Sequence, residues 1–401
     1  MNRKVLLIRE GQFLWTFQLE NNEIVEILRE DYRSVADKTS SHQLGNIYIG
    51  RVKKIQANIG AAFIEIEPGV ECYYDISQAS TAIISKKVGK KPLCIGDELL
   101  VQISKEAIKS KAITVTSNLN FTGYYVILTS GNTRIGVSTK LSKKQREEYK
   151  ALLNKYENPE FGLVLRTNAK EVSFTEIETE IATHMDSFKQ LKKKALTRTC
   201  FSCLQSAPPA YVTNLKNIYQ EGLSEIIVDD QEIFEEIRKH CQIAHPHYLD
   251  KVQLYSDEMV SLGKVYQTEQ VMRQALGERV WLKSGGYLVI QNTEALTVID
   301  VNSGKFSKKG SVTNSWLTIN REAAKEVAKQ LRLRNVSGII IVDFINMSDE
   351  ELTKELLGEL QGYLSNDPIQ TTLIGMTALQ LVEITRKKIR KPLQESIDLP
   401  L

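Results

Sequence analysis

Short alternating segments open the chain. In "KVLLIREGQFLWTFQLENNEIVEILRED" (4–31), hydrophobic and polar residues alternate in runs separated by Gly11 and by Asn21 and Asn22. A period of two is typical of strands with one buried face, and Gly and Asn-Asn favour turns. The pattern predicts a β-hairpin or meander.

A second β-rich region follows. The pattern predicts four short strands with regularly spaced turns in "GNIYIGRVKKIQANIGAAFIEIEPGVECYYDIS" (45–77) and one or two more in "IGDELLVQISKEAIKSKAITVTS" (95–117). Many short, evenly spaced strands are typical of a small OB-type barrel.

The middle of the chain is mixed. Residues 119–207 combine strands with a Lys-rich helical stretch, which predicts a small α+β unit. After two prolines, "LSEIIVDDQEIFEEIRKHC" (223–241) predicts a strand and a helix. We expect this strand to complete the opening meander, so that the barrel is an insertion.

The last third alternates strands and helices, which is typical of an α/β fold. We expect strands at 296–300 and 338–344, a helix at 320–335 between them with Asn320 as its N-cap, and a second helix at 348–364. Four apolar residues form one buried stripe on the first helix: Ala324, Val327, Ala328 and Leu331.

Each of these two strands has an aspartate at or next to its last residue. A βαβ unit makes its strands parallel, so Asp300 and Asp343 share one carboxyl edge, where open α/β sheets bind ligands. Asn302 projects from the same face as Asp300, because side chains alternate along a strand. Carboxylate and amide oxygens suit Mg²⁺ or Mn²⁺ together with phosphate. The alternative is that both aspartates only cap turns or helices.

Several basic residues accompany the two aspartates. They could contact phosphate or form a solvated basic face. They are Lys305, Lys308, Lys309, Arg332 and Arg334.

Composition adds limits. The length of 401 residues suggests two to four domains, and the net charge of +3 gives little support to a polyanionic partner except through local basic patches. No stretch approaches the ~20 apolar residues of a membrane span, and the N-terminal apolar run is short for a signal peptide. Five cysteines suit reduced thiols, and a zinc site at Cys200 and Cys203 is disfavoured. We expect a cytoplasmic protein.

The segment "LTVIDVNSGKF…NREAAKEVAKQLRLRNVSGIIIVDFINM" strongly resembles the ribonuclease E/G family of bacterial endoribonucleases. "GNIYIGRVKKI…AAFIEI" resembles that family's S1 RNA-binding domain, and "FGLVLRT" resembles its 5′-end sensor. The resemblance implies a multidomain α/β and α+β fold with an RNase H-like subdomain at 1–38 and 208–276, an inserted S1 (OB-fold) barrel at 39–118, a 5′-sensor region at 119–207, and a DNase I-like α/β catalytic subdomain at 277–401.

The resemblance also implies site residues. Asp300 and Asp343 would bind one catalytic Mg²⁺ (or Mn²⁺), and Asn302 would orient the site. Three residues would bind RNA on the S1 domain: Phe63, Tyr73 and Lys111. Five would form the 5′-phosphate sensor: Arg166, Thr167, Gly123, Ile127 and Lys140. For Phe63, a place in the barrel core remains an alternative.

The implied activity is Mg²⁺-dependent hydrolysis of phosphodiester bonds in single-stranded RNA, leaving 5′-phosphate and 3′-hydroxyl ends, in rRNA or mRNA processing or decay at AU-rich sites. The chain departs from the family in several places. Thr139 and Lys140 stand where two arginines are found, Ala378 and Gln380 replace Arg and Gly of some members, and Asn346 replaces Asp. We expect neither a structural zinc nor a zinc-linked dimer, since no Cys-x-x-Cys link follows.

Two other functions remain open. A catalytically weakened RNA- or ribosome-binding factor would explain the departures, although Asp300, Asn302 and Asp343 are intact. A purely structural interaction module would leave the convergent acids unexplained.

Overall fold

The computed structural model describes residues 2–32, 42–107, 112–217, 222–244, 246–304, 312–347 and 349–397. The chain divides into two compact units, one formed by 1–33 and 222–401 and the other by 34–221. The segments before and after the barrel therefore belong to one unit, as the sequence predicts. The five-segment division is finer than this grouping and stays a prediction.

A five-stranded sheet in the first unit joins the two ends of the chain. Its order is β16-β15-β1-β2-β3, in which β1 pairs antiparallel with β2 and parallel with β15. This pairing confirms that the strand after the prolines completes the opening meander. The strands are β1 (Arg3–Glu10), β2 (Phe13–Glu20), β3 (Glu23–Asp31), β15 (Leu223–Val228) and β16 (Val252–Leu254). The helices between β15 and the next sheet are α5 (Gln231–Ala244), α6 (Leu262–Val265) and α7 (Thr268–Leu276).

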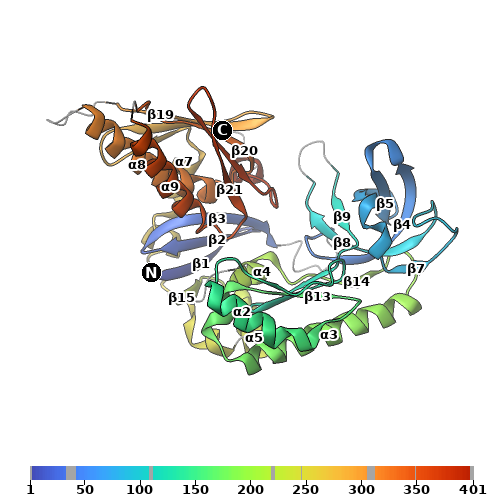
Figure 1. Cartoon of the computed structure of the whole chain (residues 1–401). Helices are drawn as coiled ribbons and strands as arrows, with labels where there is room; N and C mark the ends of the chain where they lie inside the picture. The colour runs from blue at the N-terminus through green and yellow to red at the C-terminus, as the bar shows by residue number, and fades with distance from the viewer. Residues whose placement is uncertain are drawn as a thin grey trace. The chain divides into compact units, whose positions relative to one another are not determined.

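The same unit contains a six-stranded sheet of order β17-β18-β19-β20-β22-β21, in which β19 and β20 are the parallel pair. Its strands are β17 (Arg279–Trp281), β18 (Tyr287–Asn292), β19 (Leu296–Asn302), β20 (Gly338–Asp343), β21 (Thr371–Met376) and β22 (Leu381–Arg386). Three helices accompany them: α8 (Val312–Leu333), α9 (Glu350–Leu364) and α10 (Leu393–Ser396). Figure 1 shows α8 and α9 side by side.

One face of the six-stranded sheet is buried under these helices. The apolar stripe of α8, including Ala324 and Val327, packs in a single core with Ile299, Ile340 and Val342. The residues between them on β19 and β20 point to the other face, where Ile339 is 51% exposed. We call this other face the open face.

A second core joins the two sheets of the first unit. Phe17 and Ile27 of the five-stranded sheet pack with Leu333 at the end of α8 and with Leu393 of α10. The two sheets are therefore held together by burial of apolar surface.

The second unit contains a closed five-stranded barrel. The order β4-β5-β6-β9-β8 closes because β4 also pairs with β8, and β7 and β14 add at the edges. This confirms the barrel that the spacing of short strands predicts and is consistent with an OB or S1 fold. The strands are β4 (Ile47–Gln56), β5 (Ala61–Glu67), β6 (Val70–Asp75), β7 (Ile84–Lys86), β8 (Glu98–Lys105), β9 (Thr114–Thr116) and β14 (Cys203–Gln205).

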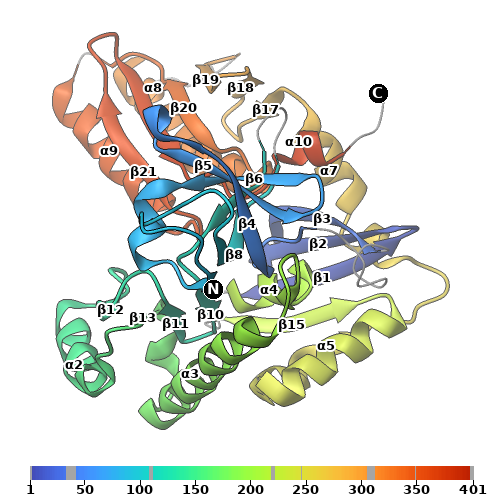
Figure 2. The ribbon, with the colours of Figure 1, turned by 90° about the vertical axis from the view of Figure 1, so that its right-hand side faces the viewer.

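A four-stranded sheet of order β10-β11-β13-β12 completes the second unit. Its strands are β10 (Asn120–Thr122), β11 (Val126–Thr129), β12 (Gly136–Val137) and β13 (Gly162–Leu165), and its helices are α2 (Lys143–Leu153), α3 (Phe174–Thr197) and α4 (Ala210–Asn217). The long helix α3 packs against β11 (Figure 2).

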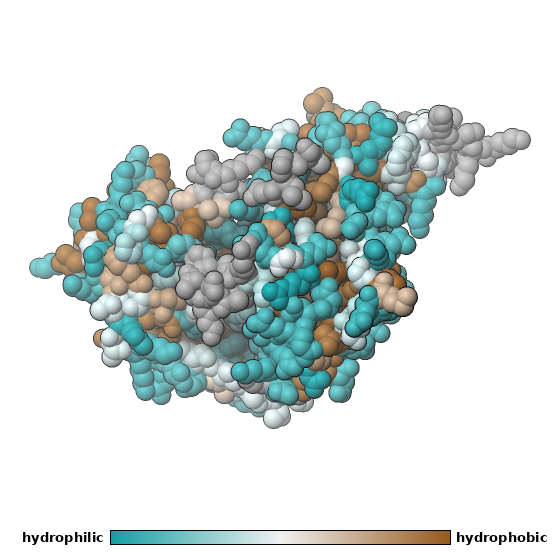
Figure 3. Space-filling model, turned by 180° about the vertical axis from the view of Figure 1, so that it is seen from behind, coloured by the Kyte–Doolittle hydropathy of each residue, from teal (hydrophilic) through white to brown (hydrophobic). Residues whose placement is uncertain are grey.

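The surface is mixed. On the face shown in Figure 3, hydrophilic residues predominate and hydrophobic ones lie in smaller patches between them. No helix among the described segments is long and apolar enough to cross a membrane.

Candidate functional site

The two aspartates lie directly beside each other. Asp300 at the end of β19 and Asp343 at the end of β20 are partners in the parallel register. Neighbouring strands are about 4.8 Å apart, so the two carboxylates can share one cation. Both side chains are exposed on the open face, while Val301 between the functional positions is buried on the other face.

Asn302 is linked to the first aspartate. Its Nδ2 donates a hydrogen bond of 2.7 Å to Oδ2 of Asp300. Within the described part of the chain, Asp343 makes no side-chain hydrogen bond or ion pair. Two like charges in register with so little compensation repel each other. The pair is therefore suited to a divalent cation.

The donor set fits Mg²⁺ or Mn²⁺. Two carboxylates and an amide are hard oxygen ligands, and Mg²⁺ typically takes one or two carboxylates and completes its shell with water and phosphate oxygens. The described residues contain no group of three or more His, Cys, Asp or Glu side chains that could hold a metal.

The strand end that carries Asp300 and Asn302 is fixed by a close backbone approach. Gly304 has a φ of +58°, and a Cβ there would lie 2.3 Å from the carbonyl oxygen of Gly285 in the β17–β18 turn. Only glycine fits both constraints without strain. The turn itself is held by the Ser284 N–H, which donates to Glu322 of α8.

The segment after Asp343 is fixed by a residue whose role differs from the prediction. Asn320 is not an N-cap, because α8 begins eight residues earlier, at Val312. Its buried side chain donates to the Ile345 carbonyl at 2.7 Å and accepts from the Ile345 N–H at 3.0 Å. These two bonds replace a strand partner for the backbone just beyond Asp343. A buried polar residue within an apolar stripe was the signal for this role.

The predicted phosphate contacts of Arg332 and Arg334 are wrong. Both are buried at the end of α8, before β20 begins, and Asp343 lies at the other end of that strand. Arg332 pairs with Glu20 at 3.3 Å, and Arg334 donates to Gln330 at 2.6 Å. Burial lowers the pKa of Arg334 to about 10. Lys305, Lys308 and Lys309 lie outside the described residues.

The two predicted stacking aromatics meet on the outside of the barrel. Phe63 and Tyr73 are cross-strand partners, with ring centroids 6.5 Å apart in an edge-to-face arrangement. Both are half-buried, and Phe63 is not part of the barrel core, which excludes that alternative. Lys111 lies outside the described residues.

Two lysines that the sequence did not single out flank this pair. Lys54 is the cross-strand partner of Phe63, and Lys105 is paired with Thr114, which is in turn the partner of Tyr73. Both lysines are exposed. Aromatic rings between cations are typical of surfaces that bind single-stranded nucleic acid.

The predicted sensor residues lie on or next to three neighbouring strands of the four-stranded sheet. Arg166 follows β13, and its Nη1 donates to the Gly123 carbonyl at 2.6 Å. The hydroxyl of Thr167 lies 2.9 Å from that of Ser138, which also accepts from the Lys140 N–H. Ile127 is on β11 beside Val164. The structure therefore brings all five residues to β11, β12 and β13.

A carboxylate that the sequence analysis missed fixes the backbone at the start of β11. Glu180 of α3 accepts hydrogen bonds from the N–H groups of Tyr124, Tyr125 and Val126 at 2.7, 2.8 and 2.8 Å. A Cβ at position 123 would lie 2.3 Å from the Glu180 carboxyl carbon, so glycine is needed there for this close approach. The side chain fixes the start of β11, which carries the Gly123 carbonyl to Arg166.

Known proteins resemble this chain in sequence. A sequence model of the ribonuclease E/G family matches residues 120–389. The chain belongs to the ribonuclease E/G family. This confirms the resemblance and places the chain in a family of endoribonucleases. Ribonuclease G of Haemophilus influenzae is 31% identical over 371 residues, which cover 88% of this chain and 74% of that protein.

Other relatives of the ribonuclease E/G family match to a similar degree. Ribonuclease G of Escherichia coli K12 is 30% identical over 88% of this chain and 74% of its own length. Ribonuclease E of Synechocystis is 30% identical over 95% of this chain and 58% of its own length.

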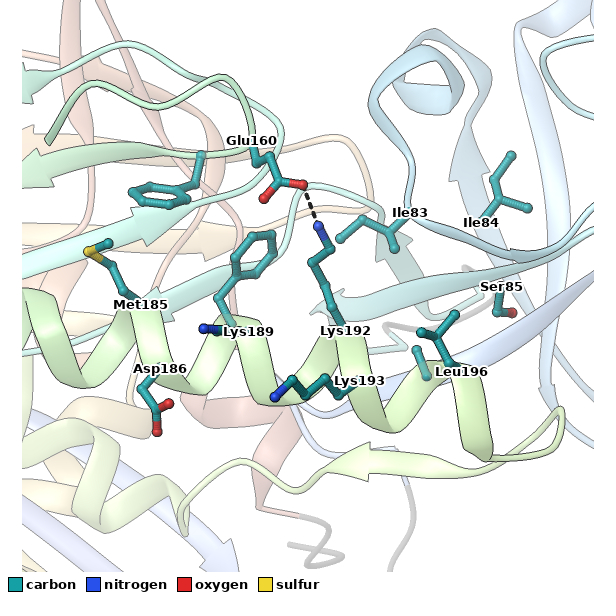
Figure 4. A pocket seen from close by; sticks show the side chains of 13 residues that line it. Ile83, Ile84, Ser85, Glu160, Met185, Asp186, Lys189, Lys192, Lys193 and Leu196 are labelled. Atoms are coloured by element: carbon teal, nitrogen blue, oxygen red, sulfur yellow. Dashed lines mark hydrogen bonds and ion pairs between the residues drawn. The ribbon is translucent and has the colours of Figure 1, made fainter.

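This ribonuclease E/G family member also has a cavity of about 810 Å³ in its second unit. Figure 4 shows it between α3 and the segment around β7, with Ile83, Leu196 and the ion pair of Lys192 with Glu160 at its wall. None of the predicted sensor residues lines it. We assign it no role in catalysis.

Proposed function

We propose that this ribonuclease E/G family member is a Mg²⁺-dependent endoribonuclease that hydrolyses phosphodiester bonds in single-stranded RNA and leaves 5′-phosphate and 3′-hydroxyl ends. The observation that carries the proposal is the pair of exposed aspartates in register, with Asn302 bonded to one of them. RNA processing or decay in the cytoplasm is the setting that fits this activity. The proposal requires no structural zinc.

Each of the site residues would have a distinct role. Asp300 and Asp343 would hold the cation on the open face, where a phosphodiester can approach. Asn302 holds the Asp300 carboxylate in one orientation. When bound, Mg²⁺ would supply a Lewis acid that activates water and offsets the charge that develops on the phosphoryl oxygens. Asn320 keeps the backbone after Asp343 in place.

RNA binding would come from the second unit. We propose that Phe63 and Tyr73 stack on bases, with Lys54 on the strand next to Phe63 and Lys105 two strands from Tyr73. At the sensor, the guanidinium of Arg166 and the hydroxyl of Thr167 would bind a 5′-monophosphate, since Arg suits phosphate through its planar set of donors. We also propose that the chain contains S1, 5′-sensor, RNase H-like and DNase I-like subdomains.

The test compares Asp343→Asn with the parent protein on a 5′-monophosphorylated single-stranded oligoribonucleotide, with Mg²⁺ or Mn²⁺ and without either. We expect the cleavage rate of the variant to be about 10³-fold or more below that of the parent, because several kcal/mol of transition-state stabilisation depend on the cation. RNA binding, measured separately, should persist.

Glu294→Gln is the matched control. Glu294 lies exposed in the turn at the opposite end of β19, so its substitution removes the same charge without touching the acid pair. Cleavage that persists in Asp343→Asn would refute the site. A parent protein that binds RNA but does not cleave it with either cation would favour the RNA- or ribosome-binding factor.

A further inference from the structure

An exposed aromatic cluster lies on the six-stranded sheet. Trp281 on the edge strand β17 is 64% exposed, and its ring centroid lies 5.1 Å from that of Tyr287 on β18. The guanidinium carbon of Arg279 lies 4.6 Å from the Tyr287 centroid and 5.7 Å from the Trp281 centroid. The cluster combines two π-faces with a cation.

The strand register places this cluster on the open face, next to the candidate catalytic residues. Trp281 is the cross-strand partner of Tyr287, and Tyr287 is the partner of Asn302. Directly paired residues project from the same face. Diagonal neighbours on adjacent strands are about 7–8 Å apart, so Tyr287 lies within about one nucleotide of Asp300.

Core packing does not explain the exposed indole. The neighbours of Trp281 in sequence, Val280 and Leu282, point to the buried face and pack against the core of the sheet, whereas Trp281 does not. A large aromatic side chain left mostly in water has apolar surface available to a ligand. Its position beside an acid pair that suits a phosphate-bound cation indicates what that ligand is.

We propose that Trp281, Tyr287 and Arg279 form a stacking subsite for a base of single-stranded RNA close to the bond that is cleaved. The inference rests on the proposed function for the identity of the substrate. A base packs on the exposed indole face, and the Arg279 guanidinium adds a cation near the rings and the RNA backbone. Stacking is tolerant of sequence because every base has a π-face, so the subsite orients the strand and does not read it.

The experiment measures binding without turnover. Fluorescently labelled, 5′-monophosphorylated octaribonucleotides, each with one nucleotide made abasic, are titrated against the full chain in EDTA. We expect one abasic position to weaken binding to the parent by about tenfold, which is typical of the loss of one stacked base. Trp281→Ala should weaken binding of the intact RNA by a similar factor and abolish the penalty at that abasic position.

Two further variants separate stacking from general disruption. Trp281→Phe keeps a π-face and should bind within about threefold of the parent. Met259→Ala removes another highly exposed apolar side chain, 93% exposed, from the same unit and should leave binding unchanged. An abasic profile that is the same in the parent and Trp281→Ala would overturn the subsite, as would equal losses in Trp281→Ala and Trp281→Phe.

The subsite and the proposed hydrolysis can fail separately. A parent protein that cleaves RNA but shows no abasic position dependent on Trp281 retains the proposed function and loses the subsite. A parent protein that shows the Trp281-dependent position but never cleaves RNA retains the subsite and loses the hydrolysis.

Discussion

The two units place a key carboxylate in opposite situations. In the first unit, Asp343 is exposed beside a second aspartate, and no described residue bonds to its side chain. In the second unit, the Glu180 carboxylate accepts three backbone N–H groups at the start of β11. Among the described residues none compensates the Asp343 carboxylate, whereas three backbone N–H groups compensate the Glu180 carboxylate.

This difference separates a binding role from a structural one. Charge-assisted hydrogen bonds to backbone N–H groups are strong and directional, so Glu180 stabilises the start of β11 without a ligand. Side-by-side aspartates repel each other, and a bound cation would relieve that repulsion. Removing the Glu180 carboxylate should therefore lower the free energy of unfolding, and removing the Asp343 carboxylate should raise it in the absence of a cation.

The largest effect on stability is expected for Glu180→Ala. The substitution leaves three N–H groups without their acceptor at buried residues 124–126, and we expect the free energy of unfolding of the second unit to fall by about 3 kcal/mol. Urea unfolding followed by circular dichroism measures it. Glu180→Gln keeps one acceptor oxygen, so its free energy of unfolding should fall by less.

Glu178 on the same helix is the matched control. Its carboxylate pairs with Lys155 at the surface, and this lowers the pKa of Glu178. Surface ion pairs contribute little to stability, so Glu178→Ala should change unfolding far less than Glu180→Ala. Equal losses in the two variants would remove the structural role assigned to Glu180.

The same contrast explains how much the sequence could predict. The acid pair was predictable because strand ends, the βαβ connection and side-chain alternation are local rules, and these place Asp300, Asn302 and Asp343 on one face. The strands of the barrel followed from the spacing of turns, and the buried stripe of α8 from its period. Residues 296–302 and 338–343 are regular strands, so the order of residues in the sequence directly gives which side chains share a face.

Contacts between distant segments were not predictable in the same way. Glu180 lies more than fifty positions from the N–H groups it accepts from, and Asn320 lies twenty-five positions from Ile345. Nothing in the local pattern distinguishes Glu180 from a solvated acid, and the position of Asn320 on the face of the apolar stripe does not identify Ile345 as its partner. Arg332 and Arg334 were misassigned for the same reason, because Arg332 pairs with Glu20 of another sheet, and Arg334, besides its bond to Gln330, donates to the backbone carbonyl of Gln274 in α7. The sensor set was available only from the resemblance to the family.

An intermediate effect is expected for Arg166→Ala. If Arg166 binds a 5′-monophosphate as well as the Gly123 carbonyl, the variant should lose about tenfold in its preference for 5′-monophosphorylated over 5′-hydroxyl RNA. Cleavage of the 5′-hydroxyl substrate should change little. Competition between the two substrates in one reaction measures the ratio directly.

Arg166→Lys and Lys140→Ala sharpen that result. Lysine keeps the charge without the planar pair of donors, so Arg166→Lys should retain part of the preference. Lys140 is exposed near Thr167, and its loss should reduce the preference by less than the loss of Arg166. An unchanged ratio in Arg166→Ala would make the arginine a structural residue, as Glu180 is.

The smallest effect, and the one that decides the comparison, is on the stability of the metal-free protein. Removing one of two like charges in register should raise the free energy of unfolding of Asp343→Asn by about 0.2–1 kcal/mol in EDTA. Mg²⁺ at ten times its dissociation constant should stabilise the parent by about 1.4 kcal/mol and the variant hardly at all, since only the parent has both ligands. Thermal unfolding with and without Mg²⁺ measures both changes, with Glu294→Gln as the control that should respond to Mg²⁺ like the parent. A loss of stability in metal-free Asp343→Asn would mean that this carboxylate, like that of Glu180, supports the fold, and the contrast between the two units would no longer hold.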